Sequence, residues 1–239
     1  MEKPIQNDDL IRINKYLSQA GILSRRKADE AIESGLVTLN GETAVAGDKV
    51  GPGDSVCYKG KPVGSVNKEK VILAYNKPLG LVCTSKEADK DSIFHHIDYP
   101  GMLYYVGRLD KNSQGLLLLT NDGELANKIQ KARNNHEKEY VVRVDKPVTE
   151  EFLKGMSDGV MLDRMTKKCK VKKISTNTFN IIITEGINRQ IRRMCECFDY
   201  RVVFLKRIRV MNIKLGNLEK GAIRKLTKQE EEVLRKLCN

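Results

Sequence analysis

Apolar residues recur at helical spacing in two short segments near the beginning of the chain. The pattern predicts helices over residues 12–20 and 25–34. Each segment is followed directly by a glycine, Gly21 or Gly35, and glycine commonly ends a helix because it adopts the left-handed conformation without strain. The two segments therefore predict a pair of short helices with defined ends.

Short strands are expected after these helices. Residues 36–39 form an apolar run that enters Asn40-Gly41, a dipeptide typical of a type I′ hairpin turn. A further strand is predicted over residues 55–58, between glycine-containing turns. Helices and strands together indicate a small α/β module over residues 10–66.

A polar stretch without apolar periodicity, residues 65–70, is expected to link this module to a larger domain over residues 71–239. In that domain the unbroken apolar run 116–119 predicts a strand that is buried on both faces. The expected strands are 71–75, 81–84, 115–120, 140–144 and 179–184, and the expected helices are 124–131, 150–156 and 189–198. Because helices and strands do not alternate strictly, we expect an α+β fold with a mixed, mainly antiparallel sheet and flanking helices.

The charge of the chain indicates what it binds. Lysine and arginine number 43 against 31 aspartates and glutamates, and the net charge of +12 points to a polyanionic partner, nucleic acid first. An anionic membrane surface is the alternative, but no apolar run approaches the roughly 18 residues that a spanning helix needs. The polar first ten residues do not predict a signal peptide either. We expect a cytoplasmic protein that does not bind membranes.

The cysteines and histidines do not predict a metal site. None of the six cysteines belongs to a C-x-x-C pair, and Cys195 and Cys197 are interpreted as packing or surface thiols. His95 and His96 are adjacent and would diverge on most backbones, while His136 stands alone. Reduced thiols again fit the cytoplasm.

Two arginines open the second expected helix. Ser24 is its expected N-cap, which places Arg25 and Arg26 in the first turn, where the helix dipole disfavours cations. The free N–H groups of the same turn attract anions, so an RNA phosphate docked there would explain the two arginines. A solvated charged face is the alternative interpretation.

The segments around these arginines resemble the S4 RNA-binding domain. The matching stretches are residues 12–17 (RINKYL), 24–29 (SRRKAD) and 37–41 (VTLNG), and the likeness covers most of residues 10–64. Two helices and a hairpin grip structured RNA in that family. The resemblance therefore implies RNA contacts for Arg12, Lys15, Arg25 and Arg26.

The larger domain resembles the pseudouridine synthases of the RsuA/RluB/RluE/RluF family. The longest match is residues 107–123 (GRLDKNSQGLLLLTNDG). Residues 136–140 (HEKEY), 166–173 (TKKCKVKK) and 188–196 (NRQIRRMCE) look most like the RluF branch. The resemblance implies an RNA pseudouridine synthase that acts on large-subunit (23S) ribosomal RNA, with transfer RNA as a second candidate substrate.

Asp110 is the candidate catalyst of this chemistry. Uridine must lose its N1–C1′ bond, turn within the pocket and rejoin through C5, so no redox or group-carrying cofactor is expected. An ionised carboxylate serves either as a nucleophile at C1′ or as a base at C2′, and the sequence leaves both routes open. By its loop position alone Asp110 is equally a turn former or a helix cap. The resemblance places it at the family's catalytic aspartate.

An ionised carboxylate in a water-poor pocket needs a cation or several donors to stay charged. With Asn188 as N-cap, the helix over residues 189–198 is expected to present Arg189, Arg192 and Arg193 outward and to pack by its apolar stripe. An ordinary amphipathic surface helix is the alternative. The resemblance implies that Arg192 pairs with the catalytic aspartate and that Arg189 and Arg193 meet RNA phosphates.

Further side chains have two interpretations each. Tyr140 is either a core aromatic or, as the resemblance implies, the residue that stacks on a flipped-out target base. Arg108 forms a surface salt bridge or, by resemblance, helps to fill the space that the base leaves. Lys167 and Lys168 contact RNA or belong to a solvated face. The cluster of Lys206, Arg207 and Arg209 has the same two interpretations.

We expect a monomeric enzyme in which the S4-like module anchors structured RNA while Asp110, Tyr140 and Arg192 act on one uridine. The rival hypothesis is an S4-type ribosome-associated protein that binds RNA without catalysis. The three catalytic candidates discriminate between these classes, because a pure binding protein does not need that combination.

Overall fold

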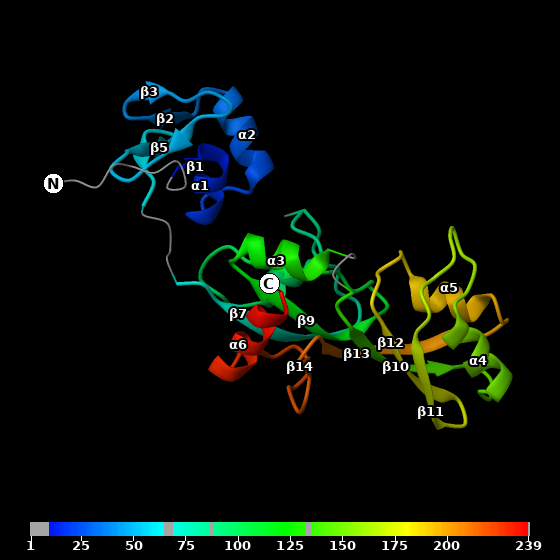
Figure 1. Cartoon of the computed structure of the whole chain (residues 1–239). Coiled ribbons are helices and arrows are strands. Elements are labelled where there is room, and N and C mark those ends of the chain that lie inside the picture. The colour runs from blue at the N-terminus through cyan, green and yellow to red at the C-terminus, as the bar shows by residue number, and fades with distance from the viewer. Residues whose placement is uncertain (1–9, 65–68, 87, 132–134, 239) are drawn as a thin grey trace. The chain divides into compact units, whose positions relative to one another are not determined.

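The computed structural model describes residues 10–64, 69–86, 88–131 and 135–238. The chain divides into two compact units, one of residues 1–70 with 100–102 and one of residues 71–99 with 103–239 (Figure 1). Residues 65–68 of the expected linker lie outside the described residues. Every helix in the described ranges is too short or too polar to span a membrane.

Two helices and several short strands form the N-terminal unit. The helices α1 (Ile13–Gln19) and α2 (Arg25–Glu33) confirm the predicted pair, and Gly21 and Gly35 follow them with positive φ angles. Their apolar faces bury Ile13 and Leu17 of α1 with Ala28, Ala31 and Ile32 of α2. The strand β1 (Ile11–Arg12) pairs with β4 (Lys49–Val50), and a four-stranded sheet has the order β3 (Glu42–Thr43), β2 (Val37–Leu39), β5 (Val56–Tyr58) and β6 (Lys61–Pro62).

The turn between β2 and β3 has the predicted geometry. Asn40 and Gly41 have φ angles of 53° and 90°, the two positive values that a type I′ turn requires. The Asn40 side chain also donates to Asp54 Oδ1 at 2.8 Å and accepts from the Ser55 backbone N–H at 2.9 Å. Hydrogen bonds from the Asn40 side chain and from the Gly51 backbone lower the pKa of Asp54. The Asn40 side chain thereby links the Asn40-Gly41 turn to the turn that contains Asp54.

A large mixed sheet organises the C-terminal unit. Its strands run in the order β11-β12-β10-β13-β9-β7-β15, with β14 beside β13 and β8 beside β9. The registered pairs are antiparallel except for β9 and β13, which pair in parallel. The predicted α+β class with a mainly antiparallel sheet is confirmed. The strands are β7 (Ile72–Lys77), β8 (Tyr104–Val106), β9 (Gln114–Thr120), β10 (Lys138–Val144), β11 (Lys170–Ser175), β12 (Thr178–Ile183), β13 (Val202–Val210), β14 (Ile213–Lys214) and β15 (Ile223–Lys225).

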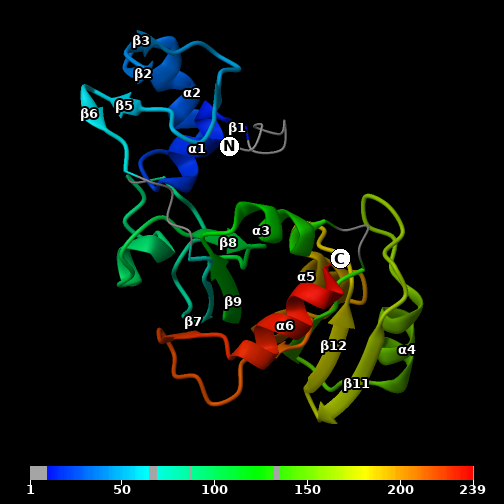
Figure 2. The same ribbon diagram turned by 60° about the vertical axis from the view of Figure 1, so that its left-hand side comes forward.

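Helices cover both faces of this sheet. They are α3 (Gly123–Gln130), α4 (Glu150–Asp158), α5 (Gln190–Glu196) and α6 (Lys228–Leu237). Leu117 and Leu119 of β9 belong to one apolar cluster with α4 and α5, and Leu116 and Leu118 belong to a second cluster with α3 and α6. Since side chains alternate along a strand, β9 is buried on both faces, as predicted. Figure 2 shows α4 beside β11 and α3 beside β8.

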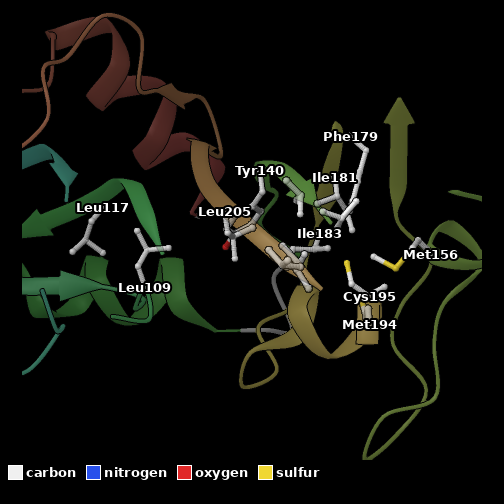
Figure 3. Close-up of a cluster of buried hydrophobic side chains, with 14 of the residues drawn as sticks. Leu109, Leu117, Tyr140, Met156, Phe179, Ile181, Ile183, Met194, Cys195 and Leu205 are labelled. Carbon is white, nitrogen blue, oxygen red and sulfur yellow. The ribbon is translucent and has the colours of Figure 1, made fainter. Parts of the chain in front are cut away.

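The first cluster surrounds the centre of the sheet. In Figure 3, Tyr140 and Leu205 lie between two groups of apolar side chains, Leu109 and Leu117 on one side and Ile181, Ile183, Met194 and Cys195 on the other. Cys195 is buried and Cys197 is exposed, as predicted for packing and surface thiols. Burial raises the pKa of the Cys195 thiol to about 12. A thiol with that pKa stays neutral and acts as a small apolar side chain.

The structure corrects the prediction for residues 81–84. This segment is not a strand, because Val82 makes only an isolated bridge to Ser92. Its apolar character serves packing instead, since Cys83 is 1% exposed within the first cluster. The short 3-10 helix η2 (Ile93–His96) follows.

The elements of the C-terminal unit that were not predicted are η2, β8, β11, β13, β14, β15 and α6, and β13 and α6 are the longest of them. The strand β13 carries Lys206, Arg207 and Arg209, whose charges obscure its apolar alternation. The helix α6 buries only Leu234 of its own residues, and a capping box at Thr227 begins it. Tertiary burial rather than a strong local pattern defines both elements.

Candidate active site

Asp110 lies in the loop between β8 and β9. Gly107 starts this loop with a φ of 72°, and the buried Leu109 anchors it in the core. Below the loop, the buried ammonium of Lys77 donates to the carbonyl oxygens of Pro78, Asp110 and Ser113 at 3.0, 3.2 and 2.9 Å. Burial lowers the pKa of Lys77. The Asp110 backbone is therefore held by an internal cation, and Asp110 lines the adjoining pocket.

The pocket beside Asp110 has a volume of about 450 Å³. Its walls come from the Asp110 loop, from β10, β12 and β13, and from the segment that leads into α5. The three catalytic candidates Asp110, Tyr140 and Arg192 all line it, although they are widely separated in sequence. Fold and loop geometry thus bring them to one place.

Tyr140 forms part of the pocket wall from the sheet. It lies on β10 opposite Ile181 of β12 and opposite Arg207 of β13. The residue is only 8% exposed, so its ring is a member of the apolar cluster as well as a pocket side chain. The position of Tyr140 is therefore compatible both with a core aromatic and with a residue that stacks on a target base.

The segment before α5 differs from the prediction. Arg189, not Asn188, is the residue that precedes the helix, and it has a left-handed conformation with a φ of 51°. Gln190 stabilises this turn, because its Oε1 accepts from Ile187 N at 3.1 Å and its Nε2 donates to Glu185 Oε1 at 3.0 Å. A left-handed residue directs the first turn of α5 into the pocket wall.

Arg192 is buried, which corrects the expectation that it points outward. Its guanidinium donates to the carbonyl oxygens of Asn112 at 2.6 Å and Val202 at 3.1 Å. Burial lowers the pKa of Arg192, and the negative charge of Asp110 opposes that shift. No ion pair joins these two side chains in the described part of the chain. Arg192 therefore acts on Asp110 through space and through the backbone of the loop that carries it.

The comparisons with known proteins decide the family. Residues 71–197 match the family model described as RNA pseudouridylate synthase, and residues 11–56 match that of the S4 domain. The chain belongs to the RNA pseudouridine synthase family. It is an isomerase with an S4 domain.

The similarity to known relatives extends over almost the full length of this chain. The chain is 50% identical to the dual-specificity RNA pseudouridine synthase RluF of Escherichia coli over 225 residues, 93% of this chain and 78% of that protein. It is 36% identical over 240 residues to the ribosomal large subunit pseudouridine synthase B of Xylella fastidiosa, covering 94% of this chain and 50% of that protein. A crystal structure of a pseudouridylate synthase, 30% identical, superimposes with a TM-score of 0.68 over 94% of this chain and 99% of that one.

Within this pseudouridine synthase, the pocket also includes two of the predicted RNA-binding residues. Arg108 and Arg189 line it and are exposed to solvent. Arg193, Lys167 and Lys168 do not line it. Arg193 forms a two-pronged ion pair with Asp163 at 2.8 and 2.7 Å, which lowers the Asp163 pKa. The Lys167 ammonium donates to Asn135 Oδ1 at 2.6 Å, and Lys168 is exposed.

The S4 domain places its four candidate basic residues on α2, on α1 and directly before α1. Ser24 caps α2 as predicted, accepting from Lys27 N at 3.3 Å, and Arg25 and Arg26 are exposed in the first turn. That turn contains no acidic residue. Arg12 is exposed directly before α1, and Lys15 is half-buried on it. The cationic first turn of α2 is thus present on the surface.

Sequence reasoning missed several residues that shape this site. Lys77, which supports the Asp110 loop, lies two residues beyond the predicted strand 71–75 and had no assigned role. Lys138 lies in the quoted HEKEY motif without an assigned role. Arg207 was expected either to contact RNA or to belong to a solvated face, and its exposure of 2% excludes the solvated face. Side chains alternate along a strand, so Lys138 leaves the same face of the sheet as Tyr140 on β10, and Arg207 leaves the same face as Leu205 on β13. This alternation would have placed Lys138 and Arg207 on the face of the first apolar cluster.

Proposed function

We propose that this enzyme converts one specific uridine of large-subunit ribosomal RNA into pseudouridine and that Asp110 is the catalytic carboxylate. The observation that carries the proposal is the single pocket shared by Asp110, Tyr140 and Arg192. Its volume of about 450 Å³ lies within the range of sites that enclose a small organic group, here a flipped-out nucleoside. A protein that only binds RNA has no use for a pocket of this composition.

Each of the three residues has a defined part in this proposal. Tyr140 offers an aromatic face on which the uracil ring stacks, at the base of the pocket. Asp110 attacks C1′ or removes the C2′ proton while the N1–C1′ bond breaks, and its fixed backbone keeps the carboxylate in place. Arg192 supplies the positive charge that keeps Asp110 ionised.

RNA outside the pocket is held by positive charge. We assign residues 10–66 to anchoring and residues 71–239 to catalysis. Anchoring uses Arg12, Lys15, Arg25 and Arg26 of the S4 domain, while Arg108, Arg189, Arg193, Lys167 and Lys168 contact RNA near the catalytic domain. Arg193 reaches a phosphate by exchanging its Asp163 partner.

The names of relatives support the choice of substrate. One relative is named for the ribosomal large subunit, and the 50% identical relative is named a dual-specificity enzyme. We infer ribosomal RNA as the main substrate and transfer RNA as the second. All three catalytic candidates come from one chain, which supports a monomer, and ribosomal RNA places its work in the cytoplasm.

Asp110→Asn tests the catalytic assignment. The substitution keeps the size of the side chain but removes the charge, so the rate of pseudouridine formation should fall by at least about 1,000-fold. Pseudouridine is measured in large-subunit ribosomal RNA and in transfer RNA transcripts, and RNA affinity is measured in parallel. We expect affinity within about twofold of the wild type, because the positive surface is unchanged.

Asp98→Asn is the matched control, since Asp98 is exposed and does not line the pocket. It should leave the rate unchanged. A wild-type rate in Asp110→Asn would show that the catalytic group lies elsewhere. Failure of the wild-type enzyme to modify either RNA while it binds both would contradict the proposed substrates.

A further inference from the structure

Lys138 is a pocket residue to which the proposed mechanism gives no task. It lies two positions before Tyr140 on β10, so both side chains leave the same face of the sheet. Lys138 is opposite Ile183 of β12, and Tyr140 is opposite Arg207 of β13. All four residues line the pocket. Two cations therefore flank the tyrosine on one continuous patch of the sheet.

The charges of Lys138 and Arg207 are poorly compensated by the protein. The Lys138 ammonium makes one hydrogen bond, to the carbonyl oxygen of His136 at 3.2 Å, and no carboxylate in the described part of the chain pairs with it. Arg207 donates through Nε to Leu116 O at 2.6 Å, whereas its buried Nη2 has no partner among the described residues. Burying unpaired positive charge destabilises the fold. Folding alone does not explain the arrangement.

The surrounding charges do not supply the missing partner. Besides Lys138, the charged side chains that line the same pocket are Asp110, Glu185, Arg108, Arg189, Arg192 and Arg207. Glu185 already accepts hydrogen bonds from Arg164, from the Lys167 backbone and from Gln190. Burial, and then the charge of Arg207, lower the pKa of Lys138 to about 8. Lys138 and Arg207 therefore give this part of the pocket a positive charge that would favour the binding of an anion.

The isomerisation itself creates an anion at this place. When the N1–C1′ bond breaks, its electron pair stays on N1, and the negative charge spreads over N1, O2 and O4 of the free uracil. This holds whether Asp110 attacks C1′ or removes the C2′ proton. C5 then bonds to C1′ while the Asp110–C1′ bond breaks, or, on the other route, while Asp110 returns its proton to C2′. The C5 proton leaves and N1 takes up a proton, so atoms and charge balance. A cation whose attraction to the ring grows as this negative charge develops in the transition state accelerates the reaction.

We propose that Lys138 is a catalytic residue whose ammonium, assisted by Arg207, stabilises the detached uracil anion while it turns over Tyr140. The inference rests on the proposed function, because it requires the target uridine to enter this pocket. It adds a separate step to that function, the stabilisation of the leaving base. The alternative is that Lys138 binds a phosphate of the RNA rather than the uracil anion.

Substitutions of Lys138 in the full-length enzyme test this role. Under single-turnover conditions with saturating enzyme, Lys138→Met should lower the rate on the order of 100-fold and leave the RNA dissociation constant unchanged. Lys138→Arg, which keeps the charge, should recover at least about a tenth of the wild-type rate. Lys154→Met, an exposed lysine of α4 outside the pocket, is the matched control.

The pH profile provides a readout that a structural role would not change. The kcat/KM of the wild type should fall as pH rises through about 8, because the ammonium loses its proton there, and this fall should be absent from Lys138→Met. Weaker RNA binding with an unchanged saturated rate would assign Lys138 to a phosphate and overturn the proposal. So would equal rates for the Met and Arg variants, or the same fall of kcat/KM in Lys138→Met.

The two proposals fail separately. If Asp110→Asn is inactive while Lys138→Met has the wild-type rate, only the role of Lys138 is wrong. If Asp110→Asn remains fully active, the pocket is not the catalytic site and the premise for Lys138 is lost with it.

Discussion

Lys77 is buried and Lys138 is half-buried, and the two lysines show how differently a protein can treat the same side chain. The ammonium of Lys77 donates to three carbonyl oxygens, so its charge is satisfied and serves to fix the Asp110 loop. Lys138 has one carbonyl partner and a neighbouring cation. The first lysine supports structure, and the second carries an unbalanced charge into the pocket. At the residue scale, stability and function therefore separate between Lys77 and Lys138.

This separation gives a prediction for the pH dependence of stability. The pKa of Lys138 is about 8 in the folded protein against 10.5 normally, so the folded state binds fewer protons between these values. The free energy of unfolding therefore rises with pH from 8 to 10.5. Lys138→Met removes this titration and should be more stable than the wild type at pH 7, on the order of 1–2 kcal/mol after allowance for partial solvent screening.

Urea unfolding of both proteins at about pH 7 and 10 measures the effect, with Lys154→Met as the control. The advantage of Lys138→Met should shrink at the higher pH. A variant that is less stable than the wild type at neutral pH would mean that the lysine contributes net packing energy.

At the scale of elements, the parallel contact between β9 and β13 joins the two halves of the large sheet. It consists of two registered pairs, Gln114 with Lys206 and Gly115 with Arg207. Gly115 has a φ of 105°, and a Cβ atom there would overlap the Arg207 carbonyl oxygen and lie 2.8 Å from its nitrogen. Only glycine permits this approach of the two strands.

Gly115→Ala should consequently destabilise the protein by at least about 3 kcal/mol, combining backbone strain with displacement of β13. Gly221→Ala separates the two causes, because Gly221 also has a positive φ of 83° but nothing lies within 4 Å of its Cβ position. That variant should lose only about 1 kcal/mol. Thermal or urea unfolding gives both values, and equal losses would exclude the steric contribution.

Local sequence signals predicted those elements whose pattern is complete in itself. The glycines after α1 and α2, the Asn40-Gly41 turn and the doubly buried run of β9 are of this kind. The strand β13 was missed because its charged side chains are buried or paired only through contacts far away in sequence. The burial of Arg192 was missed for the same reason, as Asn112 accepts its hydrogen bond from 80 positions away. The family motif placed Asp110, but the partners of the pocket required the fold.

At the scale of the whole molecule the chain divides into two compact units, to which we assign different tasks. The net charge of +12 favours RNA in general, whereas the pocket lies within the C-terminal unit alone. The N-terminal unit has its own apolar core of α1, α2 and short strands. Binding and catalysis are therefore expected to separate when the units are separated.

Removal of residues 1–68 should leave the C-terminal unit folded, because its two apolar clusters contain no residue from the deleted part. Affinity for large RNA should fall at least about tenfold, since several phosphate contacts are lost. Circular dichroism checks the fold, and filter binding at two salt concentrations checks the affinity. Unchanged affinity and unchanged choice of uridine would refute the anchoring role of the S4 domain.

The narrow parallel joint between β9 and β13 also determines what enzyme activity reports. Asp110 belongs to the strands on one side of the joint, and Tyr140 and Arg192 belong to the other side. A chain with each half correctly formed but with this joint slipped by two residues would shift the halves by about 7 Å. It would look native by its secondary structure and yet be catalytically silent. Enzyme activity therefore tests the correct register of β9 and β13 more strictly than circular dichroism does, because circular dichroism reports only secondary structure.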